Sequence, residues 1–129
     1  MSRRLSLRIL LATALLAAAA LAPAGSAPAS SSCKVLKVTS DLKSDLHDAH
    51  ARLTDRPFSG PKGRVYYGRC GTRYYALASF KDEDLGYTDQ PEQFTRRAGH
   101  GWKDRGDTGG PPCDTRVPRA LLKLWGFDC

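Results

Sequence analysis

The hydrophobic and polar positions of this chain follow three patterns that divide it into three parts. The first is an uncharged run over residues 9–21, rich in alanine and leucine, with three arginines before it and small residues over 22–27 after it. This order is typical of a secretory signal peptide. The run is well short of the roughly 20 apolar residues that span a bilayer. We therefore expect a signal peptide over 1–27, cleaved between residues 24 and 29, and a secreted, extracellular protein without a transmembrane segment.

The second pattern is the spacing of a helix face. The apolar residues that carry it are Val38, Leu42, Leu46, Ala49 and Leu53. At 100° per residue they lie within an arc of roughly 80°, which predicts an amphipathic helix. Ser40 or Asp41 could cap its start. The residues before it, 28–37, are mostly small and polar, and we expect them to form a flexible leader.

The third pattern consists of short runs rich in aromatic and apolar residues, which favour strands. The runs are 64–69, 73–80, 93–97 and 102–104. Glycines between the first two and between the last two predict two hairpins. Prolines and glycines over 57–63 predict a loop before the first run. The run 73–80 is apolar on both faces, so we expect a central strand.

These patterns predict one α+β domain over residues 38–129. In it, one amphipathic helix packs on a small antiparallel sheet of about four strands. A short helix follows, with Pro118 in its first turn and Gly126 as its stop. The expected core residues are Tyr66, Tyr74, Leu77, Phe80, Phe94, Trp102, Leu121, Leu124 and Trp125.

Four cysteines stand in the region that export would leave: Cys33, Cys70, Cys113 and Cys129. Four cysteines in an oxidising compartment favour two disulfides, with three possible pairings. The first choice is the sequential pairing, Cys33–Cys70 with Cys113–Cys129, because it closes two local loops. No two cysteines have the close spacing of paired zinc ligands, so we expect neither a metal site nor a cofactor.

The net charge also changes with export. The whole chain has 20 basic and 13 acidic residues, a formal +7. Loss of Arg3, Arg4 and Arg8 leaves 17 basic residues against 13 acidic ones, which is +4. Because the remaining basic residues are interspersed with acidic ones, the composition favours an ordinary solvated surface over a nucleic-acid-binding one.

Two segments resemble sites but are better explained as structure. Residues 106–111 resemble the nucleophile loop of chymotrypsin-like serine proteases, with Thr108 where that family has serine. Such proteases need two barrels and about twice this length, so we interpret the segment as a turn. His47 and His50 could meet on one helix face, but the sequence signals no further ligand. We expect both histidines on a solvated face.

A possible catalytic set lies in the second hairpin. His100 stands at its tip, close in sequence to Arg96 and Arg97, with Glu92 at its start. Glutamate as base, histidine as acid and arginine as charge stabiliser would suit phosphodiester cleavage. Small extracellular ribonucleases share this size and order of elements, which makes a ribonuclease the alternative hypothesis.

A possible binding surface involves the aromatic residues of both hairpins. Strand alternation would bury one tyrosine of each neighbouring pair and leave Tyr67 and Tyr75 facing outward. With Arg96, Arg97 and Trp102 they would form a surface for a partner. The competing interpretation is cross-strand packing within a small sheet.

The half of the chain from Cys70 to Cys129 carries a recognisable set of motifs. They are Cys-Gly followed by Tyr-Ala-Leu-Ala, Gln90–Phe94, Gly101-Trp102, Gly106–Gly110, Cys113, Val117-Pro118 and Leu122–Gly126. This set resembles small secreted actinobacterial proteins of unknown function. The resemblance implies a common scaffold and supplies no activity.

Taken together, these features favour a secreted, non-enzymatic domain that binds an extracellular protein or a cell-wall component. The alternative is a small secreted hydrolase acting on RNA through the residues of the second hairpin. Catalytic residues are assigned only under that alternative.

Overall fold

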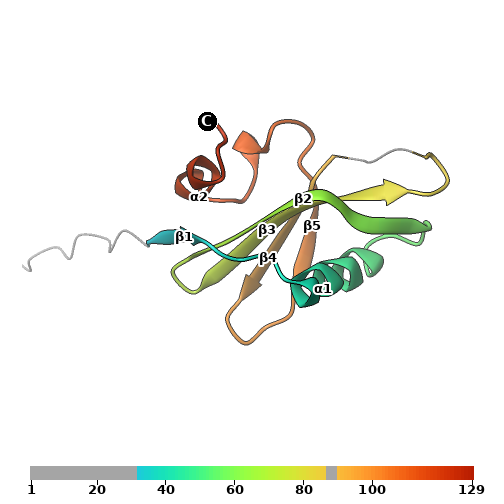
Figure 1. Ribbon diagram of the computed structural model, residues 1–129, viewed down its shortest axis with the longest axis horizontal. Coiled ribbons are helices and arrows are strands. Elements are labelled where there is room, and N and C mark those ends of the chain that lie inside the picture. The colour runs from blue at the N-terminus through green and yellow to red at the C-terminus, as the bar shows by residue number, and fades with distance from the viewer. Residues whose placement is uncertain (1–31, 87–89) are drawn as a thin grey trace, which may run out of the picture.

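The computed structural model describes residues 32–86 and 90–129 (Figure 1). The expected signal peptide, 1–27, and the first four residues of the expected leader, 28–31, therefore lie outside the described residues. The elements are β1 (Cys33–Val35), α1 (Ser40–Ala51), β2 (Phe58–Cys70), β3 (Arg73–Asp82), β4 (Glu92–Arg97), β5 (Lys103–Asp107), the 3-10 turn η1 (Pro112–Asp114) and α2 (Arg119–Leu124). The strands form one antiparallel sheet in the order β1-β2-β3-β4-β5. The predicted fold class is confirmed.

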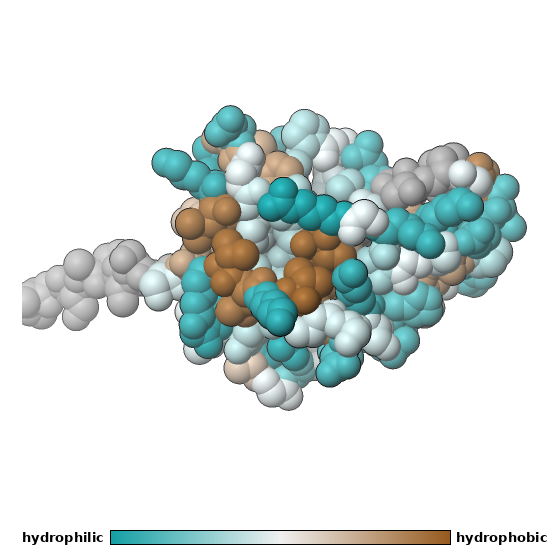
Figure 2. Space-filling view, in the orientation of Figure 1, coloured by the Kyte–Doolittle hydropathy of each residue, from teal (hydrophilic) through white to brown (hydrophobic). Residues whose placement is uncertain are grey.

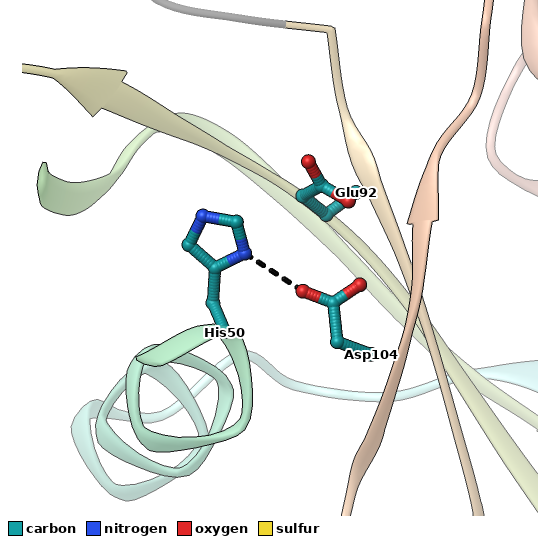
Figure 3. Close-up of side chains that lie close together, drawn as sticks. All are labelled: His50, Glu92 and Asp104. Atoms are coloured by element: carbon teal, nitrogen blue, oxygen red, sulfur yellow. Dashed lines mark hydrogen bonds and ion pairs between the residues drawn. The ribbon is translucent and has the colours of Figure 1, made fainter. Parts of the chain in front are cut away.

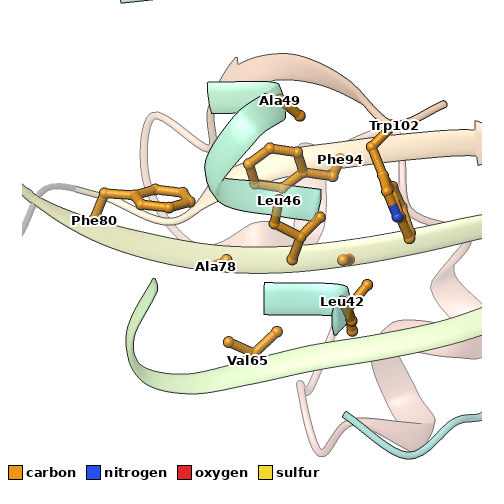
Figure 4. Packing of buried hydrophobic residues seen from close by; sticks show 9 residues of the cluster. Leu42, Leu46, Ala49, Val65, Ala78, Phe80, Phe94 and Trp102 are labelled. Atoms are coloured by element: carbon orange, nitrogen blue, oxygen red, sulfur yellow. The ribbon is translucent and has the colours of Figure 1, made fainter. Parts of the chain in front are cut away.

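Helix α1 covers one face of the sheet. Its first turn is capped by Thr39, whose Oγ1 accepts a hydrogen bond from the Leu42 backbone N–H at 3.2 Å, in place of the expected Ser40 or Asp41. An oxygen at this position satisfies a backbone donor that the helix itself leaves without a partner. Leu42, Leu46 and Ala49 then point at the sheet. Figure 4 shows these residues packed against side chains of the strands, with Phe94 and Leu46 fully buried.

Helix α2 covers the opposite face near β1 and β2. Leu121, Leu122 and Trp125 pack there against Tyr75 and Leu77. The expectation that Leu124 is a core residue is wrong, since 53% of it is exposed. At 100° per residue the three buried residues form one stripe, and Leu124 lies about 110° from the centre of that stripe.

Strand β1 lies within the segment predicted to be a flexible leader. It pairs with the end of β2, with Cys33 opposite Cys70, and a disulfide joins these two residues. A strand of three residues has no periodicity to reveal it. Its position depends on the bridge to a residue far along the chain, so the leader ends earlier than residue 37.

The segment 57–63, expected to be a loop, is mostly strand. Strand β2 begins at Phe58 and passes through two irregularities of register before Tyr66. Gly60 and Gly63, with φ of 130° and 66°, supply backbone conformations that other residues rarely adopt. The glycines therefore bend a paired strand instead of ending it.

Both preferred disulfides are present. Cys33–Cys70 joins β1 to β2, and Cys113–Cys129 joins η1 to the end of the chain. No cysteine in the described part of the chain is free.

Two observations concern the outside of the molecule. None of the helices in the described ranges is both long and apolar enough to cross a bilayer. Figure 2 shows that hydrophobic surface on one face gathers in a few patches, which hydrophilic side chains surround.

Candidate functional site

The end of the sheet formed by β4 and β5 separates charges by sign. Phe94 lies opposite Asp104, and Thr95 lies opposite Lys103. Because successive side chains of a strand point to opposite faces, Asp104 shares the α1 face with Phe94. Lys103 and Thr95 share the other face. The basic residues Lys103 and Arg105 of β5 therefore lie on one face of the sheet, and Asp104 lies on the other. We call these the basic face and the acidic face.

On the basic side the structure forms a cleft of about 310 Å³. Its lining residues are Arg73, Thr95, Arg96, Arg97, His100, Gly101, Lys103 and Arg105, and we call it the basic cleft. Five of them are permanent cations, and within the described ranges no Asp or Glu lines the cleft. Helix α2 packs over β1 and β2 and does not cover this end of the sheet.

Two of the cations stand directly opposite each other on neighbouring strands. Arg73 of β3 pairs in register with Arg97 of β4, and both residues are exposed. Like charges in this arrangement destabilise a sheet. The fold therefore carries an electrostatic cost at the basic cleft.

Two other arginines of the basic cleft are held in place. The Nε of Arg105 donates to Oγ1 of Thr95 at 2.9 Å. The guanidinium of Arg96 lies over the rings of Tyr74 and Trp102, at 4.6 and 5.0 Å from their centroids. Such stacking orients a planar cation while leaving part of its edge able to donate.

The aromatic residues expected to bind a partner are mostly covered. Tyr75 is 7% exposed and Trp102 is 5% exposed, so the expectation that these rings are accessible is wrong. Tyr75 is covered because α2 adds a layer on the second face of the sheet, and Trp102 because it packs in the core beneath α1. Tyr67 is half-buried, and its hydroxyl accepts a hydrogen bond from Arg96 Nη2 at 3.4 Å. The arginines, and not the rings, are presented to solvent.

The acidic face holds a second group of polar residues, the His50 cluster (His50, Glu92 and Asp104). Nδ1 of His50, in the last turn of α1, lies 2.7 Å from Oδ2 of Asp104 (Figure 3). The side chains of His50 and Asp104 are 12% and 2% exposed, and Glu92 is buried. One donor atom from each of the three residues lies within 4.8 Å of the others. Figure 3 shows both carboxyl groups on the side of the ring that carries Nδ1.

The expectation that His50 lies on a solvated helix face is therefore wrong. Its ring stacks on Phe80 with centroids 4.3 Å apart and meets Phe58 edge-on at 4.7 Å. At 100° per residue His50 lies on the flank of the apolar stripe of α1, about 80° from its centre. Both phenylalanines and the carboxylate come from strands of the sheet, which a helical wheel does not include. His47, with 43% of its side chain exposed, does lie at the surface.

A second cavity, also about 310 Å³, adjoins the His50 cluster. Its lining residues include His50, Glu92, Phe58, Phe80, Arg56, Asp82 and Asp107. Nη1 of Arg56 lies 3.6 Å from Oδ2 of Asp82. Hydrogen bonds from the backbone N–H groups of Leu85 and Asp84, together with the nearby Arg56, hold the pKa of the Asp82 carboxyl below its usual range, although burial opposes this.

The structure does not bring together the four residues of the hypothetical ribonuclease site. Arg96, Arg97 and His100 line the basic cleft, whereas Glu92 belongs to the His50 cluster. Glu92 and Arg97 are the two ends of β4, which at about 3.3 Å per residue places them roughly 17 Å apart. The base and the acid of the alternative ribonuclease hypothesis, Glu92 and His100, therefore belong to separate sites.

The glycine-rich segment that resembles a protease loop has the hydrogen bonds of a turn. Oδ1 of Asp107 accepts from the Gly109 backbone N–H at 2.9 Å, and the Thr108 hydroxyl donates to the Gly110 carbonyl at 2.8 Å. The hydroxyl is thus engaged within its own loop.

Comparisons of the chain with protein families, with curated proteins and with solved structures find no match.

Proposed function

We propose that this chain is a secreted binding domain whose basic cleft holds phosphate groups of an anionic polymer outside the cell. The observation that carries the proposal is the gathering of five cations around one cleft that no described carboxylate lines. In the sequence these cations are interspersed with acids. Strand alternation puts four of them on the face away from α1. Arg96 borders the same cleft from the α1 face, where it lies over Tyr74 and Trp102.

The chemistry of the basic cleft suits phosphate. Four of its five cations are arginines, whose planar groups can donate two parallel hydrogen bonds to one phosphate. The cations come from β3, β4 and β5, which as neighbouring strands are spaced about 4.8 Å apart. This spacing suits a chain of closely repeated phosphodiesters better than a single small anion.

The covered aromatic residues distinguish the expected polymer from single-stranded nucleic acid. Proteins that bind single strands stack bases on exposed aromatic rings. Here Tyr75 and Trp102 are buried, and Arg96 lies across Tyr74 and Trp102. The favoured ligand therefore offers phosphates without bases, such as the poly(alditol phosphate) chains of bacterial cell walls.

The test is a titration of the secreted protein with poly(glycerol phosphate), followed by isothermal calorimetry at several salt concentrations. We expect saturable binding whose affinity falls as the salt concentration rises. Variants Arg97→Gln and Arg105→Gln should each reduce the slope of log affinity against log salt concentration by about one, the value expected for one phosphate contact. Lys43→Gln, which removes an equal charge from an exposed position on α1, is the matched control and should bind as the wild type does.

Three outcomes would contradict the proposal. The first is no binding of poly(glycerol phosphate) at low salt, and the second is an equal loss of affinity in Arg97→Gln and Lys43→Gln. The third is tighter binding to hyaluronate, which carries more widely spaced carboxylates, than to poly(glycerol phosphate). Preference for duplex DNA over poly(glycerol phosphate) would reject the wall polymer as the ligand.

A further inference from the structure

We infer that the His50 cluster is a binding site for a divalent transition metal ion, with Zn²⁺ as the ion that its donor atoms fit best. It lies on the α1 face of the sheet, whereas four of the five cations of the basic cleft lie on the other face, and it does not depend on the function proposed for that cleft. Its three residues come from α1, β4 and β5, so the site exists only when the helix is docked on the sheet.

The spacing of the donor atoms allows one ion to contact all three residues. In a tetrahedral site zinc lies about 2.0–2.2 Å from nitrogen and oxygen ligands, which puts neighbouring ligand atoms roughly 3.3–3.6 Å apart. The three donor atoms already lie within 4.8 Å of one another. The 2.7 Å contact between His50 Nδ1 and Asp104 Oδ2 would open by less than about 1 Å as the ion replaces their shared proton.

The surroundings hold two of the three ligands in place. The second carboxylate oxygen of Asp104, Oδ1, accepts a hydrogen bond from the Gly106 backbone N–H at 2.8 Å. The imidazole of His50 is stacked on Phe80, with 11° between the ring planes. Partners of this kind orient metal ligands and raise affinity.

Charge and access both suit a divalent ion. Two carboxylates and a neutral imidazole carry a formal charge of −2, which one divalent cation neutralises within a site where the Asp104 side chain is only 2% exposed. His50 and Glu92 also line the second cavity, which would admit water to the remaining coordination positions. Three protein ligands plus water is the arrangement of open zinc sites.

The donor types select among metals. Calcium takes six to eight oxygen ligands and magnesium keeps most of its waters, whereas an imidazole nitrogen beside two carboxylates suits zinc. The described cysteines are all in disulfides and offer no competing thiolate. Zinc added to this protein should therefore go to His50 before other sites in the described part of the chain.

The experiment is a titration of the untagged secreted protein with ZnCl₂, followed by calorimetry and by NMR of the histidine ring nitrogens. We expect binding of one ion per chain, a large shift of the His50 Nδ1 resonance, and at least a tenfold loss of affinity in Glu92→Gln and in His50→Gln. His47→Gln is the matched control: it removes an exposed histidine from the same helix and should bind as the wild type does.

Circular dichroism of each variant shows whether it is folded. If His50→Gln does not fold, Glu92→Gln still tests the inference, because it keeps the His50 ring and its stacking on Phe80. CaCl₂ and MgCl₂ at the same concentrations should leave the His50 resonances unchanged. The inference is overturned if the wild type binds no zinc below about 100 μM, if the shifted resonances belong to His47 or His100, or if folded Glu92→Gln retains full affinity. The cluster would then be a structural His–Asp pair.

Discussion

Arg97 provides a test of whether the basic cleft is maintained for binding and not for the fold. Its charge stands directly opposite that of Arg73 on the neighbouring strand, and both residues are exposed. If these charges serve a ligand, neutralising one of them should weaken polymer binding and stabilise the folded protein at the same time. A structural role would instead make both properties worse.

The size of the effect follows from Coulomb's law. If the two guanidinium groups are taken as roughly 8 Å apart, their charges repel by about 0.5 kcal/mol at the dielectric constant of water. Cross-strand pairs contribute about 0.2–1 kcal/mol, which agrees with that figure. Arg97→Gln should therefore stabilise the domain by about 0.5 kcal/mol, and Arg97→Glu, which turns repulsion into attraction, by about 1 kcal/mol. For a domain near 100 residues these changes raise the melting temperature by about 2–4 °C and 4–8 °C.

Differential scanning calorimetry in about 10 mM salt measures this series, with Lys43→Gln as the control for net charge. In about 1 M salt the Debye length falls to roughly 3 Å, so the gains should disappear. A lower melting temperature for Arg97→Gln, or a gain that survives 1 M salt, would show that the reasoning is wrong. So would Arg97→Glu variants that are stabilised yet bind poly(glycerol phosphate) with unchanged affinity.

Two further predictions concern the scaffold. Gly68→Ala should destabilise the domain by about 1–3 kcal/mol, because the added Cβ would lie 2.5 Å from Cδ1 of Leu121 and 2.9 Å from the backbone carbonyl oxygen of Lys34. Urea denaturation measures the loss, and an unchanged midpoint would mean that both α2 and β1 move away freely. The carboxyl of Asp82 has its pKa lowered, chiefly by the Leu85 backbone N–H, so it stabilises the folded state above its unfolded pKa, and this contribution is lost as the pH falls below about 4. The stability difference between wild type and Asp82→Asn should therefore narrow between about pH 6 and pH 2.5, and a constant difference would contradict the assignment.

The parts of the fold that the sequence predicts are those with local causes. The spacing of Leu42, Leu46 and Ala49 is sufficient to orient α1, because one helix face meets one surface. Glycine-containing turns separate the paired strands of both hairpins. The disulfide pairing also agrees with the prediction, because the sequential pairing closes the shortest loops that the four cysteines allow, with separations of 37 and 16 residues.

The parts that the sequence did not predict depend on contacts between distant segments. Strand β1 has three residues and is positioned by the bridge between Cys33 and Cys70. Tyr75 would be accessible on a sheet covered on one face only, and its burial depends on α2. In the same way the sequence predicts a solvent-facing His50, because no pattern in α1 shows that Asp104 lies beside it.

One signal for the charged sites was nevertheless present in the sequence. Lys103, Asp104 and Arg105 alternate in sign at the end of the predicted strand 102–104 and just beyond it. Strand geometry sends the basic pair to one face and the acid to the other. A count of net charge does not show this alternation, because opposite charges cancel in the sum, and it therefore indicates a surface of mixed charge. The sheet instead converts it into a basic cleft on one face and the His50 cluster on the other. Both proposals therefore depend in part on β5, because Lys103 and Arg105 line the basic cleft and Asp104 belongs to the His50 cluster. Single variants on the two faces can test them separately.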